Sequence, residues 1–270
     1  MGFKVISGSP QTVWAPIADS DTIYIGQLVK CAGTGGGISP AGTASGAADT
    51  TGKGVLYGIV VGTNNSTPAY NSTYRTEYIT DATPKASTTI FTGHEGPWSK
   101  GDHCAMAEVS IINPSTVVRA PIFKGAVGTV LPEMTVTASK GHYGQATIDT
   151  TLQHGYSAGT SYYGTAYFRT GPNAGAYRLL TSQSSSICLT WDKDLYAAAS
   201  NDDKVIVVKG IRPNGLSKIF VDSESLFISN AVTSTVNYYL GQVVRLDLRE
   251  SGNEFCDFTF APPHFDLKRA

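Results

Sequence analysis

Short apolar runs alternate with Gly-, Ser- and Thr-rich segments along most of this chain. The run 22–31 is rich in β-branched and aromatic residues and is interrupted by Gly26, whereas the run 54–62 is almost continuously apolar. Apolar runs bounded by turn residues predict buried strands. Because the segment 33–54 between them lacks large apolar side chains, we expect the two runs to pair as a hairpin with a long loop.

The same pattern recurs to the end of the chain, so we predict many strands and almost no helix. The segment 195–199 is the one helix candidate, and it is too short to organise a fold. We therefore predict an all-β fold of β-barrel or β-sandwich (β-tulip-like) domains with long Gly/Ser/Thr-rich loops. Further strands are predicted at 73–80, 103–112, 117–118, 126–130, 134–138, 144–152, 176–181, 187–191, 204–209 and 242–248.

A Gly-, Ser- and Tyr-rich stretch near 140–160 suggests a domain boundary. We place an N-terminal β domain at 1–145 and a second β domain at 146–270. The ends, 1–16 and 261–270, are predicted to be extended arms that become ordered on contact with a partner.

One heptapeptide pattern occurs twice, at 23–29 and at 238–244. From its second position on, an aromatic residue, an apolar residue, Gly, Gln and two apolar residues follow one another. We interpret it as a turn that enters a strand, in which Gly supplies backbone freedom. Chance similarity and a duplicated sheet explain a single short repeat equally well.

Charge excludes several classes of partner. Charged residues make up only 15% of the chain, the net charge is −1, and no run of Lys and Arg occurs. A nucleic-acid binder needs a basic stripe to displace counterions, so we expect no nucleic-acid partner. Neither membrane-surface binding nor a spanning helix is indicated. The N-terminus has no apolar signal segment, so we expect synthesis in a cytosol.

The four cysteines are scattered, without a paired CxxC spacing. We expect them to be reduced core residues, with two disulfides as the alternative if the mature protein is found outside a cell. The cysteines are Cys31, Cys104, Cys188 and Cys256.

Two groups of side chains could ligate a metal. His94–Glu95 and Asp102–Cys104 form the densest cluster, but adjacent residues on a strand point to opposite faces, so we expect a turn and a strand there. An acidic run could offer oxygen ligands to Ca²⁺, although its spacing is not that of an EF-hand, and we expect a solvated turn. The acidic run consists of Asp192, Asp194, Asn201, Asp202 and Asp203. No metal site is predicted.

No motif for catalysis or for a cofactor stands in a supporting context. The glycines at 33–37 and 52–54 lack the phosphate-loop pattern and a following helix, so we expect flexible loops. The turn 171–175 carries no serine nucleophile. Asn64, Asn65 and Asn71 fit the glycosylation rule but are expected to be polar turn residues. Aromatic residues in or beside loops indicate either protein contacts or core: Trp14, Trp98, Tyr70, Tyr74, Tyr156, Tyr162 and Tyr163.

Two segments resemble structural proteins of tailed phages. Residues 13–62, with Ile23-Tyr24-Ile25-Gly26-Gln27-Leu28-Val29 and Gly54-Val55-Leu56-Tyr57-Gly58-Ile59-Val60, resemble the N-terminal β region of capsid decoration (cement) proteins. Residues 168–178, with the strands that follow at 187–191 and 204–209, are similar to a β module of phage head and tail proteins.

This resemblance implies a virion protein on the capsid surface that decorates and stabilises a phage shell. It further implies a homotrimer or another symmetric cluster, with the major capsid protein as partner. We expect no enzymatic activity and no cofactor. The alternatives are a jelly-roll capsid subunit, a fibre or host-attachment protein that binds carbohydrate, and a β-rich hydrolase.

Overall fold

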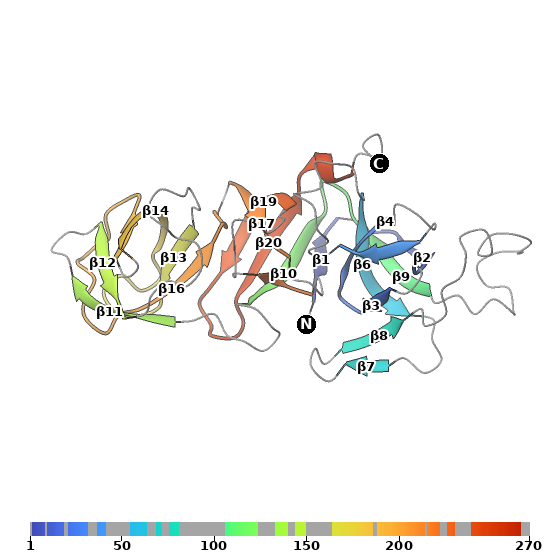
Figure 1. Cartoon of the computed structure of the whole chain (residues 1–270). Helices are drawn as coiled ribbons and strands as arrows, with labels where there is room; N and C mark the ends of the chain where they lie inside the picture. The colour runs from blue at the N-terminus through green and yellow to red at the C-terminus, as the bar shows by residue number, and fades with distance from the viewer. Residues whose placement is uncertain are drawn as a thin grey trace, which may run out of the picture.

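The computed structural model confirms an all-β fold. It describes residues 2–8, 10–18, 21–31, 37–41, 55–63, 69–71, 76–80, 106–123, 133–139, 144–149, 164–185, 188–213, 215–221, 226–229 and 239–265. These residues form twenty strands, and their one helical element is a single turn of 3-10 helix, η1 (Pro262–Phe265). In Figure 1 a barrel lies at one end, a central sheet in the middle and two smaller sheets at the other end. In the described part of the chain, no helix has the length and hydrophobicity needed to span a membrane.

The central sheet gathers strands from the whole length of the chain. Its strands run antiparallel, except that one short strand, β18 (Ile228–Ser229), pairs with β10 in parallel. Their order is β1 (Lys4–Ser7), β10 (Val117–Phe123), β20 (Phe255–Phe260), β19 (Tyr239–Asp247) and β17 (Leu216–Ile219).

The barrel is formed by the segment between β10 and β17, so it interrupts the chain path of the central sheet. Its own core includes Phe168 and Trp191, whose rings meet edge to face at 5.4 Å. Around the barrel the strands are β11 (Glu133–Ser139), β12 (Gln145–Ile148), β15 (Cys188–Trp191), β14 (Tyr177–Ser185), β13 (Gly164–Phe168) and β16 (Lys204–Lys209).

The N-terminal sheets comprise eight strands. The larger sheet has the order β2 (Thr12–Pro16), β9 (Met106–Ile111), β6 (Leu56–Thr63), β4 (Leu28–Cys31) and β5 (Ile38–Pro40). The smaller sheet has the order β3 (Thr22–Tyr24), β8 (Thr76–Thr80) and β7 (Ala69–Asn71). The predicted pairing of the two runs is confirmed, because β4 and β6 pair antiparallel. The segment between them is not all loop as predicted, since it contains β5, which pairs with β4 and buries Ile38.

One hydrophobic core joins all three parts. Alternate residues of β10 and β20, such as Val118 and Phe258, point into this core. The N-terminal sheet contributes Ile59 to the same core, and the barrel contributes Tyr167 and Val208. Since apolar burial contributes roughly 25 cal/mol per Å², the shared core stabilises the three parts as one body.

The prediction that residues 1–16 form an arm that becomes ordered only on contact with a partner is wrong. The segment is extended, but β1 pairs with β10 and β2 pairs with β9, and Phe3 is buried in the shared core. The backbone of an extended segment gains hydrogen bonds by joining a sheet edge, and here both edges belong to the same chain. At the C-terminus, residues 262–265 form η1 instead of an extended arm, and His264 is buried there. Residues 266–270 lie outside the described residues.

The helix candidate 195–199 is also wrong. The segment contains bends but no helical turn, and Leu195 and Ala199 are buried in the barrel core. The buried side chain of Asn173 donates to the Ala197 carbonyl at 3.0 Å and accepts from the Ala197 N–H at 3.2 Å. Because this amide satisfies the backbone groups of Ala197, the segment needs no helix to satisfy them.

The predicted domain limit at 145/146 coincides with the start of β12, within the barrel. The division into domains 1–145 and 146–270 stays a prediction.

Candidate functional site

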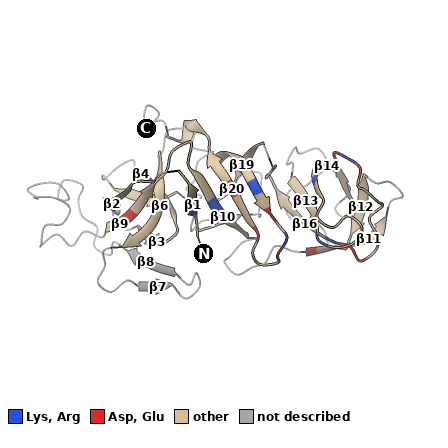
Figure 2. Ribbon diagram, turned by 180° about the vertical axis from the view of Figure 1, so that it is seen from behind, with Lys and Arg blue, Asp and Glu red and all other residues tan. Residues whose placement is uncertain are grey.

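A row of charged side chains crosses four strands of the central sheet. In the strand register Lys4 of β1 faces Arg119 of β10, Arg119 faces Asp257 of β20, and Asp257 faces Arg245 of β19. Residues paired across antiparallel strands lie on the same face, so these four share the face opposite the core. Figure 2 shows basic positions on both β10 and β19, in a ribbon that is mostly neither basic nor acidic.

The next row places an aromatic ring among these charges. Phe255 pairs with Pro121 on one side and with Asp247 on the other. The guanidinium carbon of Arg119 lies 4.0 Å from the centre of the Phe255 ring, and that of Arg245 lies 5.2 Å from it. Both distances are within the range of a cation–π interaction, so Phe255 holds two guanidinium groups over one ring.

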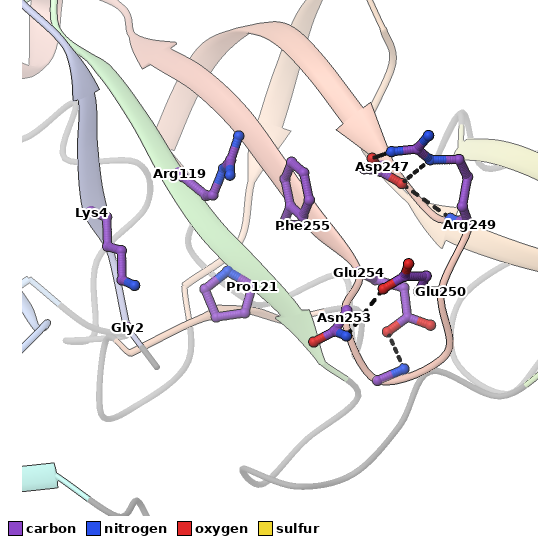
Figure 3. A pocket seen from close by; sticks show the side chains of 11 residues that line it. Gly2, Lys4, Arg119, Pro121, Asp247, Arg249, Glu250, Asn253, Glu254 and Phe255 are labelled. Atoms are coloured by element: carbon purple, nitrogen blue, oxygen red, sulfur yellow. Dashed lines mark hydrogen bonds and ion pairs between the residues drawn. The ribbon is translucent and has the colours of Figure 1, made fainter.

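These rows border a pocket of about 340 Å³ between the start of β1 and the turn from β19 to β20. In Figure 3 Lys4, Arg119 and Pro121 stand on one side of Phe255, with Asp247 and Arg249 on the other. We call it the Phe255 pocket. It is lined by Gly2, Lys4, Arg119, Pro121, Asp247, Arg249, Glu250, Gly252, Asn253, Glu254 and Phe255.

Two carboxylates hold the turn that closes the pocket. Glu254 accepts the Gly252 N–H at 2.9 Å, and Glu250 accepts from the Asn253 side-chain amide at 3.2 Å. Gly252 has a φ of 84°, a left-handed conformation that glycine adopts without strain. The turn is therefore shaped by its own side chains.

A buried ion cluster lies where the barrel meets the central sheet. Arg169, just after β13, pairs with Glu254 and with Glu133, and donates to the Leu248 carbonyl at 2.9 Å. The Arg169 side chain is 7% exposed and that of Glu254 is 0% exposed. Burial lowers the pKa of Arg169, but its hydrogen bonds to Glu133 and Glu254 outweigh that effect and raise the pKa overall. Nearby, the Tyr177 hydroxyl donates to the Leu246 carbonyl at 3.0 Å.

On the outward face of the central sheet, the acids lie beneath the bases. Asp257 is 7% exposed and accepts two hydrogen bonds from Arg119, which is 32% exposed. Asp247 is 8% exposed and binds both Arg245 and Arg249, which are 51% and 63% exposed. Solvent over the Phe255 pocket therefore meets guanidinium groups rather than the carboxylates that pair with them.

These ion pairs fix the protonation states. Hydrogen bonds from Arg249, together with one from Arg245, lower the pKa of Asp247 to about 2, against the effect of burial. The hydrogen bond to Asp257 raises the pKa of Arg119. Asp247 and Arg119 therefore stay charged throughout the neutral pH range.

The calcium candidates serve the local structure of the barrel. Asp192 accepts the Leu179 N–H at 2.9 Å, and Asp203 accepts the Ser200 N–H at 2.9 Å. Asp203 is buried instead of solvated as predicted, and Asp202 has a φ of 72°. No three His, Cys, Asp or Glu side chains within the described ranges are grouped to hold a metal ion.

Most other sequence candidates are not brought to the pocket. Trp14 lies in β2, and Asn71 and Tyr70 lie in β7. The 171–175 segment is the turn between β13 and β14, as predicted. Cys31, Cys188 and Cys256 are free thiols, and burial raises the pKa of Cys256. Outside the described residues lie His94, Glu95, Asp102, His103, Cys104, 33–36, 52–54, Asn64, Asn65, Trp98, Tyr74, Tyr156, Tyr162 and Tyr163.

Sequence reasoning missed the whole Phe255 pocket. The available signal was the alternation of apolar and polar residues in 117–123 and 255–260, which predicts one face in the core and one outside. The pocket also needs Lys4, more than a hundred residues before its neighbour Arg119, and a local pattern does not reveal such pairing.

The chemistry of the pocket favours binding. The described residues that line it offer ammonium, guanidinium, carboxylate, amide and phenyl groups. They include no Ser, Cys or His that could act as a nucleophile or as the base that activates one. Guanidinium groups beside an aromatic ring bind carboxylates well. Comparison with protein-family models, with curated proteins and with solved structures found no match to this chain.

Proposed function

We propose that this chain is a structural protein of a tailed-phage particle. In this role it decorates the outer surface of the shell and stabilises it by binding across subunits of the major capsid protein. The two segments that resemble phage decoration and virion proteins supply the functional class. The proposed site of action is the virion surface, after synthesis in the host cytoplasm.

One observation carries the proposal: a shared core and a buried ion cluster join three β parts into a single body. A protein that stiffens a shell must not bend between its contacts. Close-packed interiors transmit strain, so a body joined in this way is suited to bridging neighbouring subunits.

We propose further that the chain acts without catalysis and assembles as a homotrimer. The residues that line the Phe255 pocket supply groups for binding but no nucleophile with its base, which supports a role without catalysis. Symmetric assembly would strengthen a weak single contact through effective concentration. Light scattering of the purified chain tests the trimer, and a monomer at the concentrations used for shell binding would contradict it.

The test is binding to shells purified without this chain. Full-length protein is mixed with such shells and sedimented, and we expect a saturating, fixed copy number per capsomer and a higher temperature of shell disruption. Absence of co-sedimentation, or binding that leaves shell stability unchanged, would contradict the proposal. Deleting residues 1–14 would not be a clean test of attachment, because it would remove β1 and most of β2.

A second candidate function, carbohydrate binding, is favoured by one residue. Tyr196 on the barrel is 82% exposed, and the guanidinium of Arg178 lies 5.2 Å from the centre of its ring. An exposed ring held in place is a suitable stacking surface for a sugar. Glycan-array binding that disappears in Tyr196→Ala would favour a host-attachment role.

A further inference from the structure

We propose that the Phe255 pocket receives the carboxylate side chain of an acidic peptide segment. This inference rests on the proposed function, and the segment would belong to the shell protein. Three features of the described residues support it: unused cationic groups, their exposure, and an acidic boundary on one side.

Within the described part of the chain, Lys4 and Arg119 keep hydrogen-bond donors that no other residue uses. Arg119 binds Asp257 through Nε and Nη2, so its Nη1 is not engaged in those two bonds. Lys4 is exposed and forms no ion pair with any described residue. Residues paired across neighbouring strands have Cβ atoms about 5 Å apart, so the two cationic groups can reach one carboxylate.

The layering of charge makes this face attractive to an anion. Asp257 and Asp247 are almost fully buried, whereas the arginines that cover them are one third to two thirds exposed. An incoming carboxylate meets the guanidinium groups first, and the Phe255 ring holds the guanidinium of Arg119 in place beside the pocket.

The acidic residues on the opposite side of the pocket favour an acidic peptide over a polyanion as the ligand. Glu250 and Glu254 line the pocket at the β19–β20 turn, and Figure 3 shows them together with Asn253. A phosphate backbone would bring further negative charges against Glu250, the exposed carboxylate of this turn. A single carboxylate beside Lys4 avoids this repulsion, while the side-chain oxygen of Asn253 can accept a hydrogen bond from a peptide N–H. A volume of about 340 Å³ is at the small end for a ligand pocket and suits one side chain.

The test uses the full-length, isotope-labelled chain and NMR. The probes are the capped tripeptide Gly-Glu-Gly, its Gly-Gln-Gly twin, inorganic phosphate and a twelve-nucleotide oligothymidylate. We expect saturable shifts at Lys4, Arg119 and Phe255 with the Glu peptide, and at least tenfold weaker binding of the Gln peptide. Equal binding of the two peptides, or tighter binding of phosphate or the oligonucleotide, would overturn the inference.

A second test compares the shell binding of two matched charge-reversal variants. Lys4→Glu reverses the charge in the pocket, and Lys193→Glu makes the same change at an exposed position on the barrel. We expect at least tenfold weaker shell binding for Lys4→Glu and less than twofold change for Lys193→Glu. If the unmodified chain binds shells and Lys4→Glu binds equally well, the pocket inference is wrong while the proposed function stands. If the unmodified chain does not bind shells, the proposed function fails, and the peptide titration alone decides whether the pocket binds carboxylates.

Discussion

Two arginine clusters lie on neighbouring parts of this molecule and differ in their access to water. Arg169 is almost completely buried against Glu254, where the barrel meets the central sheet. Arg119, Arg245 and Arg249 pair with buried aspartates but keep much of their own surface exposed. A buried pair is costly to break, whereas exposed pairs contribute little stability and remain available to a partner. We therefore infer a structural role for the first cluster and propose a binding role for the second.

Removing Arg169 should have the largest effect on stability. Arg169→Ala leaves the Glu254 carboxylate buried without its charge partner, which costs about 3–5 kcal/mol of the free energy of unfolding. Urea denaturation measures this loss, and Lys193→Ala, which removes an exposed cation elsewhere on the barrel, serves as control. A loss below about 1 kcal/mol would show that the cluster does not hold the barrel to the sheet.

Phe255→Ala should have the next largest effect. It removes a half-buried ring and both cation–π contacts, and we expect a loss of about 2 kcal/mol. Phe255→Leu keeps most of the apolar area but has no aromatic face, so the difference between the two variants isolates the guanidinium contacts. Identical unfolding midpoints for Phe255→Leu and the unmodified chain would mean that the two arginines gain nothing from the ring.

Acid should weaken the outward face through Asp247. Its folded-state pKa of about 2 lies below the ordinary value, so its stabilising contribution is present above about pH 4 and is lost as the pH falls toward 2. We expect about 1 kcal/mol, because both arginine partners are more than half exposed and water screens them. Unfolding followed from pH 5 to pH 2 should show a shallower fall in Asp247→Asn than in the unmodified chain. The same slope in both proteins would contradict the assignment.

Arg245→Ala should have the smallest effect on stability. Its side chain is half exposed, and Arg249 still pairs with Asp247, so we expect about 0.5 kcal/mol. In shell binding, however, the same variant should lose several-fold affinity and should show a weaker dependence on salt concentration. A large loss of stability without any loss of binding would reverse the roles of the two clusters.

Local patterns were sufficient for much of the fold. The continuous apolar run of β6 and the Gly26 interruption between β3 and β4 predict what the structure shows, with a φ of 83° at Gly26. Residues 255–260 were not predicted as a strand, although β20 lies at the centre of the central sheet. Its alternation of apolar and polar residues extends over only six residues, and its strand state also depends on β10 and β19 beside it.

The repeated heptapeptide shows how strongly context acts. At 24–29 it forms a turn in which the buried Gln27 accepts the Tyr24 N–H at 2.9 Å. At 239–244 the same pattern lies inside β19, where Gln242 is exposed and Gly241 packs closely against the Thr259 carbonyl. One pattern therefore has two structures, because the neighbouring strands differ.

The candidate site could not be predicted from local patterns for a related reason. The Arg169–Glu254 pair spans 85 residues, and the Arg119–Asp257 pair spans 138. The partners of each pair are separated in the sequence by barrel strands, and the two ends of this separation meet again only in the folded central sheet and at its border with the barrel. The alternation in β10 indicates an outward face, but it does not identify which strands lie beside it.

A cryo-electron microscopy map of shells saturated with the full-length chain tests the central claim most directly. The account predicts that the outward face of the central sheet lies against the shell, with density from a shell-protein segment between Lys4 and Phe255. A map in which the chain is bound but that face is open to solvent would contradict the binding role of the exposed arginines. A map without the chain on the shell would contradict the virion role itself.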